Sequence, residues 1–283
     1  MSVRSIIIRF LWLVVLGGVL VANLPASAQS ARTVVDTVGL EKGDDVELHA
    51  RRGHIDVRTW DRAAIRVRAE IVGDDPEQVE ETTIEVSRDT GGVAVKPDGE
   101  DVESPGFFEV VGAAFFGHEE PKGPETNYTV RLPSWASLRL SMNAASAEIT
   151  GLQSEVEIEG ISSSVTVRDV EGRVVAGTLS GRLHAENIEG ELLLGTFSGN
   201  LEAKVSTLAD DLQMGSFSGD AEITLPADAA FDLQTDVSWG GVTSDFSLPD
   251  SVSATEAPEV PIGGGGPMVV FESFTGSLTL RAE

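Results

Sequence analysis

The sequence predicts an all-β protein that folds as a β-solenoid with rungs of about 18 residues, where a rung is one turn of the coiled chain. A short motif recurs at steps of 18, 18 and 20 residues, as Ile161-Ser162-Ser163, Leu179-Ser180-Gly181, Phe197-Ser198-Gly199 and Phe217-Ser218-Gly219. Between the copies, apolar and polar residues alternate with a period of two, which indicates strands. Val, Ile, Thr, Ser and Gly are abundant and long helical patterns are missing, which favours the all-β class.

The aligned copies contain five columns that are apolar in every copy, and we expect all five to face the interior. In the first copy these columns lie at Val156, Ile158, Ile161, Val165 and Val167. The third column continues through Leu179, Phe197 and Phe217. Because one rung cannot bury its apolar side alone, successive rungs must stack about 4.8 Å apart with backbone hydrogen bonds between them. An antiparallel sandwich with accidental repetition is the alternative.

Residues 1–28 have the pattern of a secretory signal peptide. Arg4 and Arg9 supply the positive start, residues 10–23 are mostly apolar, and Ala26-Ser27-Ala28 fits a cleavage site. An uncleaved anchor is the alternative. No later segment approaches the roughly 20 apolar residues that span a bilayer. We therefore expect an exported chain, periplasmic or at the cell surface, that does not span the membrane after cleavage.

Residues 29–96 read as the N-terminal, β-rich part of the solenoid domain. Short alternating runs are separated by expected turns at residues 51–53 and 60–62. Asp75-Pro76-Glu77 begins one short helix that reaches about Glu81, because proline suits the first helical turn and acidic residues suit its positive end. Two further strands are expected near residues 83–87 and 92–96.

Residues 97–127 interrupt the alternation with a Gly, Pro and Glu-rich segment that carries Phe107, Phe108, Phe115 and Phe116. A loop of this length is unusual in a compact domain unless it is mobile or functional. Two interpretations stay open: a cap over the open end of the solenoid, or a contact loop for a partner. These four phenylalanines are the candidate partner-contact residues.

Residues 128–283 contain the solenoid repeats. We expect the first rung near Leu138, corners at the small residues Thr178, Thr196 and Ser216, and an outward bulge at residues 206–210. Residues 247–267 are rich in Pro, Ser and Gly and are expected to form a mobile loop. The motif returns at residues 274–280, which we expect to form the last rung.

Composition excludes several partners and chemistries. The chain has 20 basic and 46 acidic residues and a net charge of −26, which argues against nucleic acids and anionic lipids, because phosphate binding depends on Lys and Arg. The absence of cysteine excludes disulfides, thiolate metal sites and cysteine nucleophiles.

One stretch resembles a known family. The segment GHIDVRTWD at residues 53–61 resembles the opening motif of the bacterial putative-adhesin family of exported β-solenoid proteins. Leu132-Pro133, the Ser-Gly motifs and the closing FTGSL at residues 274–278 resemble it too. The resemblance covers about residues 34–281 and implies a cell-envelope β-solenoid with no established catalytic residues. The Phe-rich insertion and the glycine tract near residue 263 depart from the family pattern, so no binding role carries over there.

The remaining polar residues do not assemble a predicted active site. His49 and His54 are expected at the surface of strands, because two histidines without a third ligand are weak evidence for zinc. Adjacent acids such as Asp44-Asp45 suit turns better than the paired carboxylates of glycoside hydrolysis. Ser180, Ser198 and Ser218 recur at one repeat position, which favours a corner ladder over a nucleophile. We predict no catalytic residue, no metal site and no cofactor.

These observations favour a non-catalytic, exported β-solenoid that acts as a surface-binding, adhesin-like module of the bacterial cell envelope. Its partner would be an unknown protein or glycan of the envelope. A structural scaffold that assembles into oligomers through the solenoid ends is the alternative. A carbohydrate-active enzyme is disfavoured, because 18-residue rungs leave turns too short to wall a substrate groove.

Overall fold

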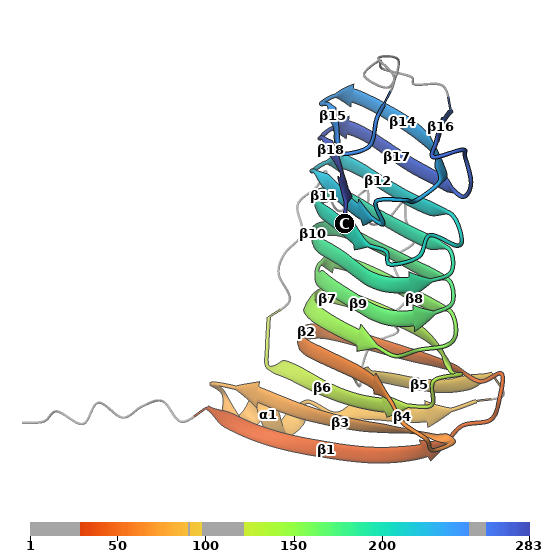
Figure 1. The fold of residues 1–283 in the computed structure, drawn as a ribbon. Helices are drawn as coiled ribbons and strands as arrows, with labels where there is room; N and C mark the ends of the chain where they lie inside the picture. The colour runs from red at the N-terminus through yellow and green to blue at the C-terminus, as the bar shows by residue number, and fades with distance from the viewer. Residues whose placement is uncertain (1–28, 90, 98–121, 249–258) are drawn as a thin grey trace, which may run out of the picture.

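The computed structural model describes residues 29–89, 91–97, 122–248 and 259–283 (Figure 1). The predicted signal peptide and most of the predicted insertion loop, including Phe107, Phe108, Phe115 and Phe116, lie outside the described residues. Eighteen strands and one short helix make up the regular structure of the described part, so the all-β prediction is confirmed.

The N-terminal elements form one end of the molecule (Figure 1). They are β1 (Ser30–Gly39), β2 (Asp45–Thr59), β3 (Ala64–Gly73), α1 (Pro76–Glu81), β4 (Ile84–Arg88), β5 (Gly92–Pro97) and β6 (Glu125–Leu132). Strand β3 pairs antiparallel with both β1 and β6, whereas β2 pairs parallel with β5, β6 and β7. The predicted helix forms, and the Asp75 side chain caps it by accepting a hydrogen bond from the Glu77 amide. The turn expected at residues 51–53 is present as a corner within β2, where Gly53 has a φ of +117° while residues 52–58 stay in register with β7.

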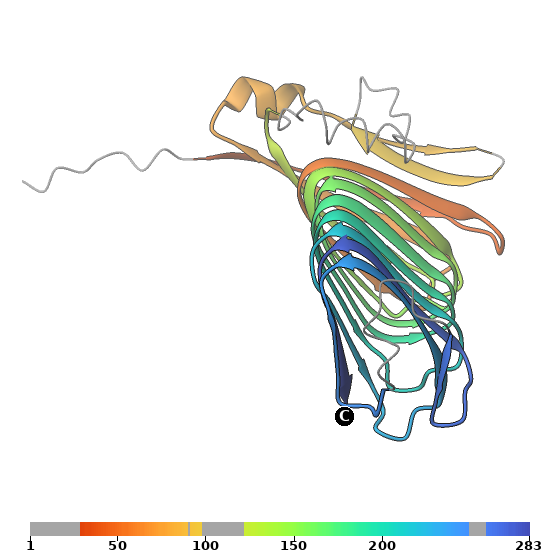
Figure 2. The same ribbon diagram turned by 90° about the horizontal axis from the view of Figure 1, so that it is seen from above.

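The rest of the described chain forms a parallel stack. Its strands are β7 (Ser137–Thr150), β8 (Val156–Ser162), β9 (Ser164–Glu171), β10 (Val174–Glu189), β11 (Leu192–Lys204), β12 (Leu212–Ser218), β13 (Ala221–Leu225), β14 (Phe231–Trp239), β15 (Val242–Ser244), β16 (Val260–Ile262), β17 (Met268–Thr275) and β18 (Leu278–Ala282). Val174 pairs with Leu192, and Leu192 pairs with Leu212, so equivalent positions of successive repeats lie side by side. Figure 2 shows successive strands following the same course when the stack is seen from above. Parallel pairing excludes the antiparallel sandwich.

The order of the last strands differs from the expectation. Strand β17 pairs with β12 on one side and with β14 on the other, so the chain returns and inserts β17 between strands that precede it in sequence. The prediction that residues 274–280 form the last rung was therefore wrong, and β14 with β15 lies beyond them (Figure 1). Residues 260–262, expected in a loop, form β16 and pair antiparallel with the start of β14.

Four of the five apolar columns are buried in the stack, as predicted. The third column is buried only in part. Val174, Leu192 and Leu212 are at most 2% exposed, as expected. In the third column Ile161 is buried, but Phe217 is 45% exposed. The alternation does not slip at Ser216: that residue still faces inward, so the next residue faces outward. The corner comes later, at Ser218 and Gly219.

Ion pairs between rungs neutralise part of the acidic surface. Arg173 lies between two carboxylates, with Nε 2.7 Å from Glu191 Oε2 and Nη1 3.0 Å from Glu155 Oε1. These hydrogen bonds, first that to Glu191, raise the pKa of Arg173. Arg168 likewise contacts Glu148 and Glu186 from the neighbouring strands. The parallel register places Glu186 directly beside Arg168, and Glu148 lies two positions along the other neighbouring strand, so one arginine can separate charges that would otherwise repel.

Glu159 gives a test of this surface through pH. Partial burial raises the pKa of Glu159 above its ordinary value of 4.5, the charge of Glu157 raises it further, and Arg139 lowers it. The folded state therefore binds the proton more readily than the unfolded state, so the charged carboxylate destabilises the fold as pH rises through and above 4.5. Glu159→Gln should raise the melting temperature at about pH 7 and leave it nearly unchanged at about pH 3, as measured by circular dichroism.

Glu189 supplies the control for this prediction. Its side chain is exposed on β10, so Glu189→Gln removes a solvated charge and should change the melting temperature little at either pH. An equal gain from both substitutions at neutral pH would contradict the burial argument and assign the effect to net charge alone.

Candidate ligand-binding surface

A ladder of three phenylalanine rings runs along the outside of β11, β12 and β17. The rings of Phe197 and Phe217 are stacked with centroids 4.7 Å apart, and those of Phe217 and Phe274 with centroids 5.0 Å apart. Phe217 and Phe274 are 45% and 47% exposed. The parallel register causes this stacking, because it places the residues that follow Thr196, Ser216 and Ser273 directly beside one another. We call Phe197, Phe217 and Phe274 the aromatic ladder.

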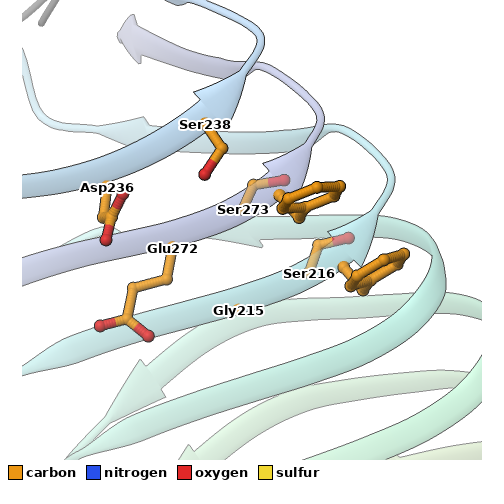
Figure 3. Close-up of a pocket in the computed structure, with 8 residues that line it drawn as sticks. Gly215, Ser216, Asp236, Ser238, Glu272 and Ser273 are labelled. Atoms are coloured by element: carbon orange, nitrogen blue, oxygen red, sulfur yellow. The ribbon is translucent and has the colours of Figure 1, made fainter. Parts of the chain in front are cut away.

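Beside the aromatic ladder lies a hollow with a volume of about 360 Å³ (Figure 3). Eight residues of β12, β14 and β17 line it: Gly215, Ser216, Phe217, Asp236, Ser238, Glu272, Ser273 and Phe274. A Cβ atom at Gly215 would meet nothing within 4 Å, so the space outside this residue is open. Figure 3 shows the carboxylates of Asp236 and Glu272 projecting from neighbouring strands on the same face. We call this site the acidic hollow.

Two carboxylates lie next to each other in the acidic hollow without a counterion. Asp236 pairs in register with Glu272, and both side chains are exposed. No Lys, Arg or His of the described residues lies within 4.0 Å of either carboxylate. Strands β12, β14 and β17 contain no Lys or Arg at all. This arrangement differs from the columns around Arg168 and Arg173, where a cation separates the acids.

Two buried hydroxyl groups near the hollow have no hydrogen-bond partner among the described residues. Ser216 and Ser273 are 7% and 6% exposed, and the Oγ atom of each is unpaired. At the equivalent position of β10, the hydroxyl of Thr178 lies 2.9 Å from the carbonyl oxygen of Ser180. Both serines lie on the buried side of their strands, whereas Phe217, Glu272 and Phe274 lie on the exposed side, so the two hydroxyls face the interior of the stack and are not open to the hollow.

The other residues singled out from the sequence are not brought together with the hollow. His49 is buried rather than at the surface, with Nε2 3.1 Å from Glu47 Oε1. His54 is exposed and bonds Ser146 Oγ at 2.9 Å. Among the described residues, no three His, Asp or Glu side chains are grouped as a metal site.

The corner serines and the paired acids have structural roles in the described chain. Ser180 Oγ lies 3.4 Å from Ser162 Oγ, which fits a ladder between rungs. Asp44 is in a turn, where its carboxylate accepts a hydrogen bond from the Glu41 amide and pairs with Arg88. These contacts give neither group the neighbours that a nucleophile or an acid–base pair requires.

Sequence reasoning missed the hollow because it assigned Phe217 to the core and gave Asp236 and Glu272 no role. The strict alternation from Leu212 through Met214 to Ser216 contained the signal for Phe217, since counting onward in twos places the phenylalanine outside. No local sequence pattern indicated that β17 would insert between β12 and β14.

The comparison with family models decides the family. The Toastrack DUF4097 model matches residues 17–259, which is most of the chain. The chain belongs to the Toastrack DUF4097 family. This membership confirms the resemblance to the family of adhesin-like proteins drawn from the sequence motifs. No curated protein matches this Toastrack chain.

The comparison with solved structures finds several that align with most of the Toastrack chain. A structure described as a putative adhesin from Bacteroides fragilis is 10% identical, with a TM-score of 0.48, and covers 89% of this chain and 97% of its own. A putative cell adhesion protein from Clostridium sporogenes is 10% identical, with a TM-score of 0.40 and coverage of 90% and 100%. A putative lipid binding protein from Parabacteroides distasonis is 10% identical, with a TM-score of 0.42 and coverage of 88% and 96%. Within the described residues of the Toastrack chain, no helix is long and apolar enough to cross a bilayer.

Proposed function

We propose that the protein is an exported, non-catalytic binding module of the bacterial cell envelope, in which a β-solenoid of 18-residue rungs holds an aromatic ladder toward a partner. The partner is an envelope protein or glycan. The signal-peptide pattern of residues 1–28 supports export to the periplasm or the cell surface.

The observation that carries the proposal is the exposure of stacked phenylalanine rings. Phe217 and Phe274 leave about half of their surface in contact with water although the stack has an interior that buries Phe231 and Phe271 completely. Contiguous apolar groups on an otherwise acidic surface mark a site of contact with another molecule. Trp239, 72% exposed at the end of β14, adds a further aromatic side chain to the same end of the stack.

The rigidity of the parallel stack suits a binding role. Each ring of the aromatic ladder is fixed by a strand with parallel neighbours, so the rings need little ordering when a ligand arrives. Catalysis finds less support. His54 Nδ1 lies 2.9 Å from Ser146 Oγ, but no Asp or Glu of the described residues lies within 4.0 Å of the His54 ring to orient it as a base.

A substitution in the aromatic ladder tests the proposal. The variant Phe217→Ser with Phe274→Ser should bind isolated envelope material at least about tenfold more weakly than the wild-type protein, because both contact surfaces are lost. Cosedimentation of residues 29–283 with cell walls and outer membranes measures this binding. Equal binding by both proteins would overturn the proposal.

Val35 provides the matched control for the ladder variant. Its side chain is 50% exposed on β1, at the opposite end of the molecule (Figure 1), so Val35→Ser removes exposed apolar surface without touching the ladder. This variant should bind like the wild-type protein. Circular dichroism of all the variants establishes that the fold is retained.

Assembly through the solenoid ends is the second candidate function. Within the described residues, β14 has a strand partner on its outer side only at residues 231–233, where β16 pairs with it. The unpaired part of such an edge can accept a strand from another copy. Size-exclusion chromatography with light scattering tests this role: oligomers that grow with concentration support it, and a monomer at all concentrations excludes it.

A further inference from the structure

We propose that two copies of the protein pair through strand β1 into a symmetric dimer, in which the two β1 strands run antiparallel with Val34 at the twofold axis. The partner is a second copy of this chain. The inference deepens the assembly role named above as the second candidate function, but it uses the end of the molecule opposite to β14 and stops at a dimer (Figure 1). It does not depend on the binding role of the aromatic ladder.

Strand β1 is a free edge of the sheet at the N-terminal end of the molecule (Figure 1). In the described part of the chain it pairs with β3 alone, over all of Ser30–Gly39 and without a bulge. Edge strands that stay unpaired are commonly short, bulged or marked by Lys or Pro, and β1 has none of these features. The strand is therefore open to pairing with another strand.

The backbone groups of the odd-numbered residues of β1 point toward the free edge. Gly39 lies opposite Ala64, and at the next position the Leu40 amide donates to the Ala63 carbonyl oxygen at 3.0 Å. Hydrogen-bonded and non-hydrogen-bonded residue pairs alternate along antiparallel strands. The even-numbered residues therefore bond to β3, and the odd-numbered residues direct their amide and carbonyl groups outward.

Side chains satisfy these outward groups at one end of β1 only. The Asp36 carboxylate accepts a hydrogen bond from the Thr37 amide at 2.6 Å, and Arg88 donates to the Gly39 carbonyl oxygen. Both contacts agree with the outward direction of the odd-numbered residues. Toward the centre of the edge, no group of the described residues bonds the outward amide or carbonyl of Thr33.

Two charges on the inner face of β1 lack a counterion. Arg32 donates from Nη1 to the Glu80 carbonyl oxygen at 2.7 Å and from Nη2 to the Thr82 carbonyl oxygen at 2.8 Å, so both of its acceptors are neutral. Asp36 is exposed on the same face, four residues along the strand. Among the described residues, no group of opposite charge lies within 4.0 Å of Arg32 or Asp36. Each charge could therefore be neutralised by a second copy.

These charges select one register for the dimer. With Val34 opposite its own copy, Arg32 of each chain lies opposite Asp36 of the other chain, twice by symmetry. Opposite charges directly across a strand pair are stabilising, and like charges are destabilising. Sliding the strands by two residues would leave Asp36 facing Val34 or Ser30. Sliding them by four would place Arg32 or Asp36 opposite its own copy.

The register chosen by charge also satisfies the backbone. It places Thr33 opposite Val35 of the other copy and Ala31 opposite Thr37, so outward groups meet outward groups. Each such pair exchanges two hydrogen bonds. The Thr37 amide then bonds a carbonyl oxygen of the other strand, which releases the Asp36 carboxylate toward the arginine.

The mass of the exported protein, expressed as the full chain, tests the inference first. Size-exclusion chromatography with light scattering should show a monomer at low micromolar concentration and twice that mass at submillimolar concentration. The dimer should dissociate on dilution because one strand pair buries less surface than a stable interface requires. Asp36→Lys should raise the dissociation constant at least about tenfold, because it places two cations opposite each other. The matched control Glu189→Lys changes the same charge on an exposed residue of β10 and should dimerise like the wild-type protein.

A backbone variant separates strand pairing from side-chain contact. Thr33→Pro should abolish the dimer, because it removes an outward amide that β3 does not use, and proline is tolerated on edge strands at such positions. Thr33→Val keeps the amide and should still dimerise. Circular dichroism establishes that both variants fold.

Cysteine cross-linking tests the register, since the chain contains no cysteine of its own. Val34→Cys should form a disulfide-linked dimer on mild oxidation, because the Cα atoms of a non-hydrogen-bonded pair are about 4.5 Å apart, within the range of disulfides. The matched variant is Val35→Cys, at a side chain that is 50% exposed. Its two copies would lie diagonally, about 7–8 Å apart, which is too far. Random collisions would instead favour the more exposed Val35→Cys.

Four results would overturn the inference: a monomer at every concentration, oligomers that grow beyond a dimer, an undiminished dimer of Thr33→Pro, or cross-linking of Val35→Cys as fast as that of Val34→Cys. Growth beyond a dimer would favour the β14 edge instead. Failure of the binding function is read separately, because cosedimentation of the ladder variant does not measure the mass of the protein.

Discussion

Replacing Gly199 with alanine is expected to lower the free energy of unfolding by roughly 3 kcal/mol or more, because the new methyl group has no room. A Cβ atom at Gly199 would lie 1.8 Å from the carbonyl oxygen of Gly181 in the neighbouring strand. Gly219 is placed in the same way over Gly199. The obstacle is backbone rather than a movable side chain, so the two strands must separate and lose hydrogen bonds of the ladder.

The same strand contains the control for this substitution. Gly195 lies four residues earlier in β11, and a Cβ atom there would meet nothing within 4 Å. Gly195→Ala should therefore change the free energy of unfolding by no more than about 0.5 kcal/mol. Urea unfolding of both variants, followed by circular dichroism, measures the difference. Similar midpoints for the two variants would contradict the close packing of glycines at the corner.

The stacking of the repeats could be predicted from the sequence because a parallel register converts sequence period into spatial neighbourhood. Val174, Leu192 and Leu212 occupy equivalent positions in the repeat and pair directly in the structure. The 20-residue step between Leu192 and Leu212 is absorbed where expected, since residues 206–210 lie between β11 and β12 and are mostly exposed. The local sequence pattern is therefore sufficient to predict the register of the repeats and the position of the bulge.

The acidic hollow could not be predicted because it depends on a long-range pairing. Asp236 and Glu272 become neighbours only when β17 enters between β12 and β14, and no local periodicity encodes that order. The outward position of Phe217 is different, since it follows from alternation alone. Apolar character at a repeated position indicated the core, but three stacked rings can also shield one another at the surface.

Two phenylalanines of β17 are expected to respond very differently to truncation. Phe271→Ala should lower the free energy of unfolding by about 3–5 kcal/mol, because its ring is completely buried and its removal leaves a cavity. Phe271 lies between Met214 and Thr235 of the neighbouring strands, both also buried, so the surrounding strands cannot collapse into the space without losing register.

Phe274→Ala, only three residues later, should cost no more than about 1 kcal/mol, because the ring is 47% exposed and loses mainly its stacking on Phe217. Chemical unfolding of both variants under identical conditions measures the ratio of the two costs. The same pair separates stability from binding, since Phe274→Ala should weaken envelope binding while the fold persists. If both substitutions destabilised the protein equally, Phe274 would belong to the core and the aromatic ladder could not be a contact surface.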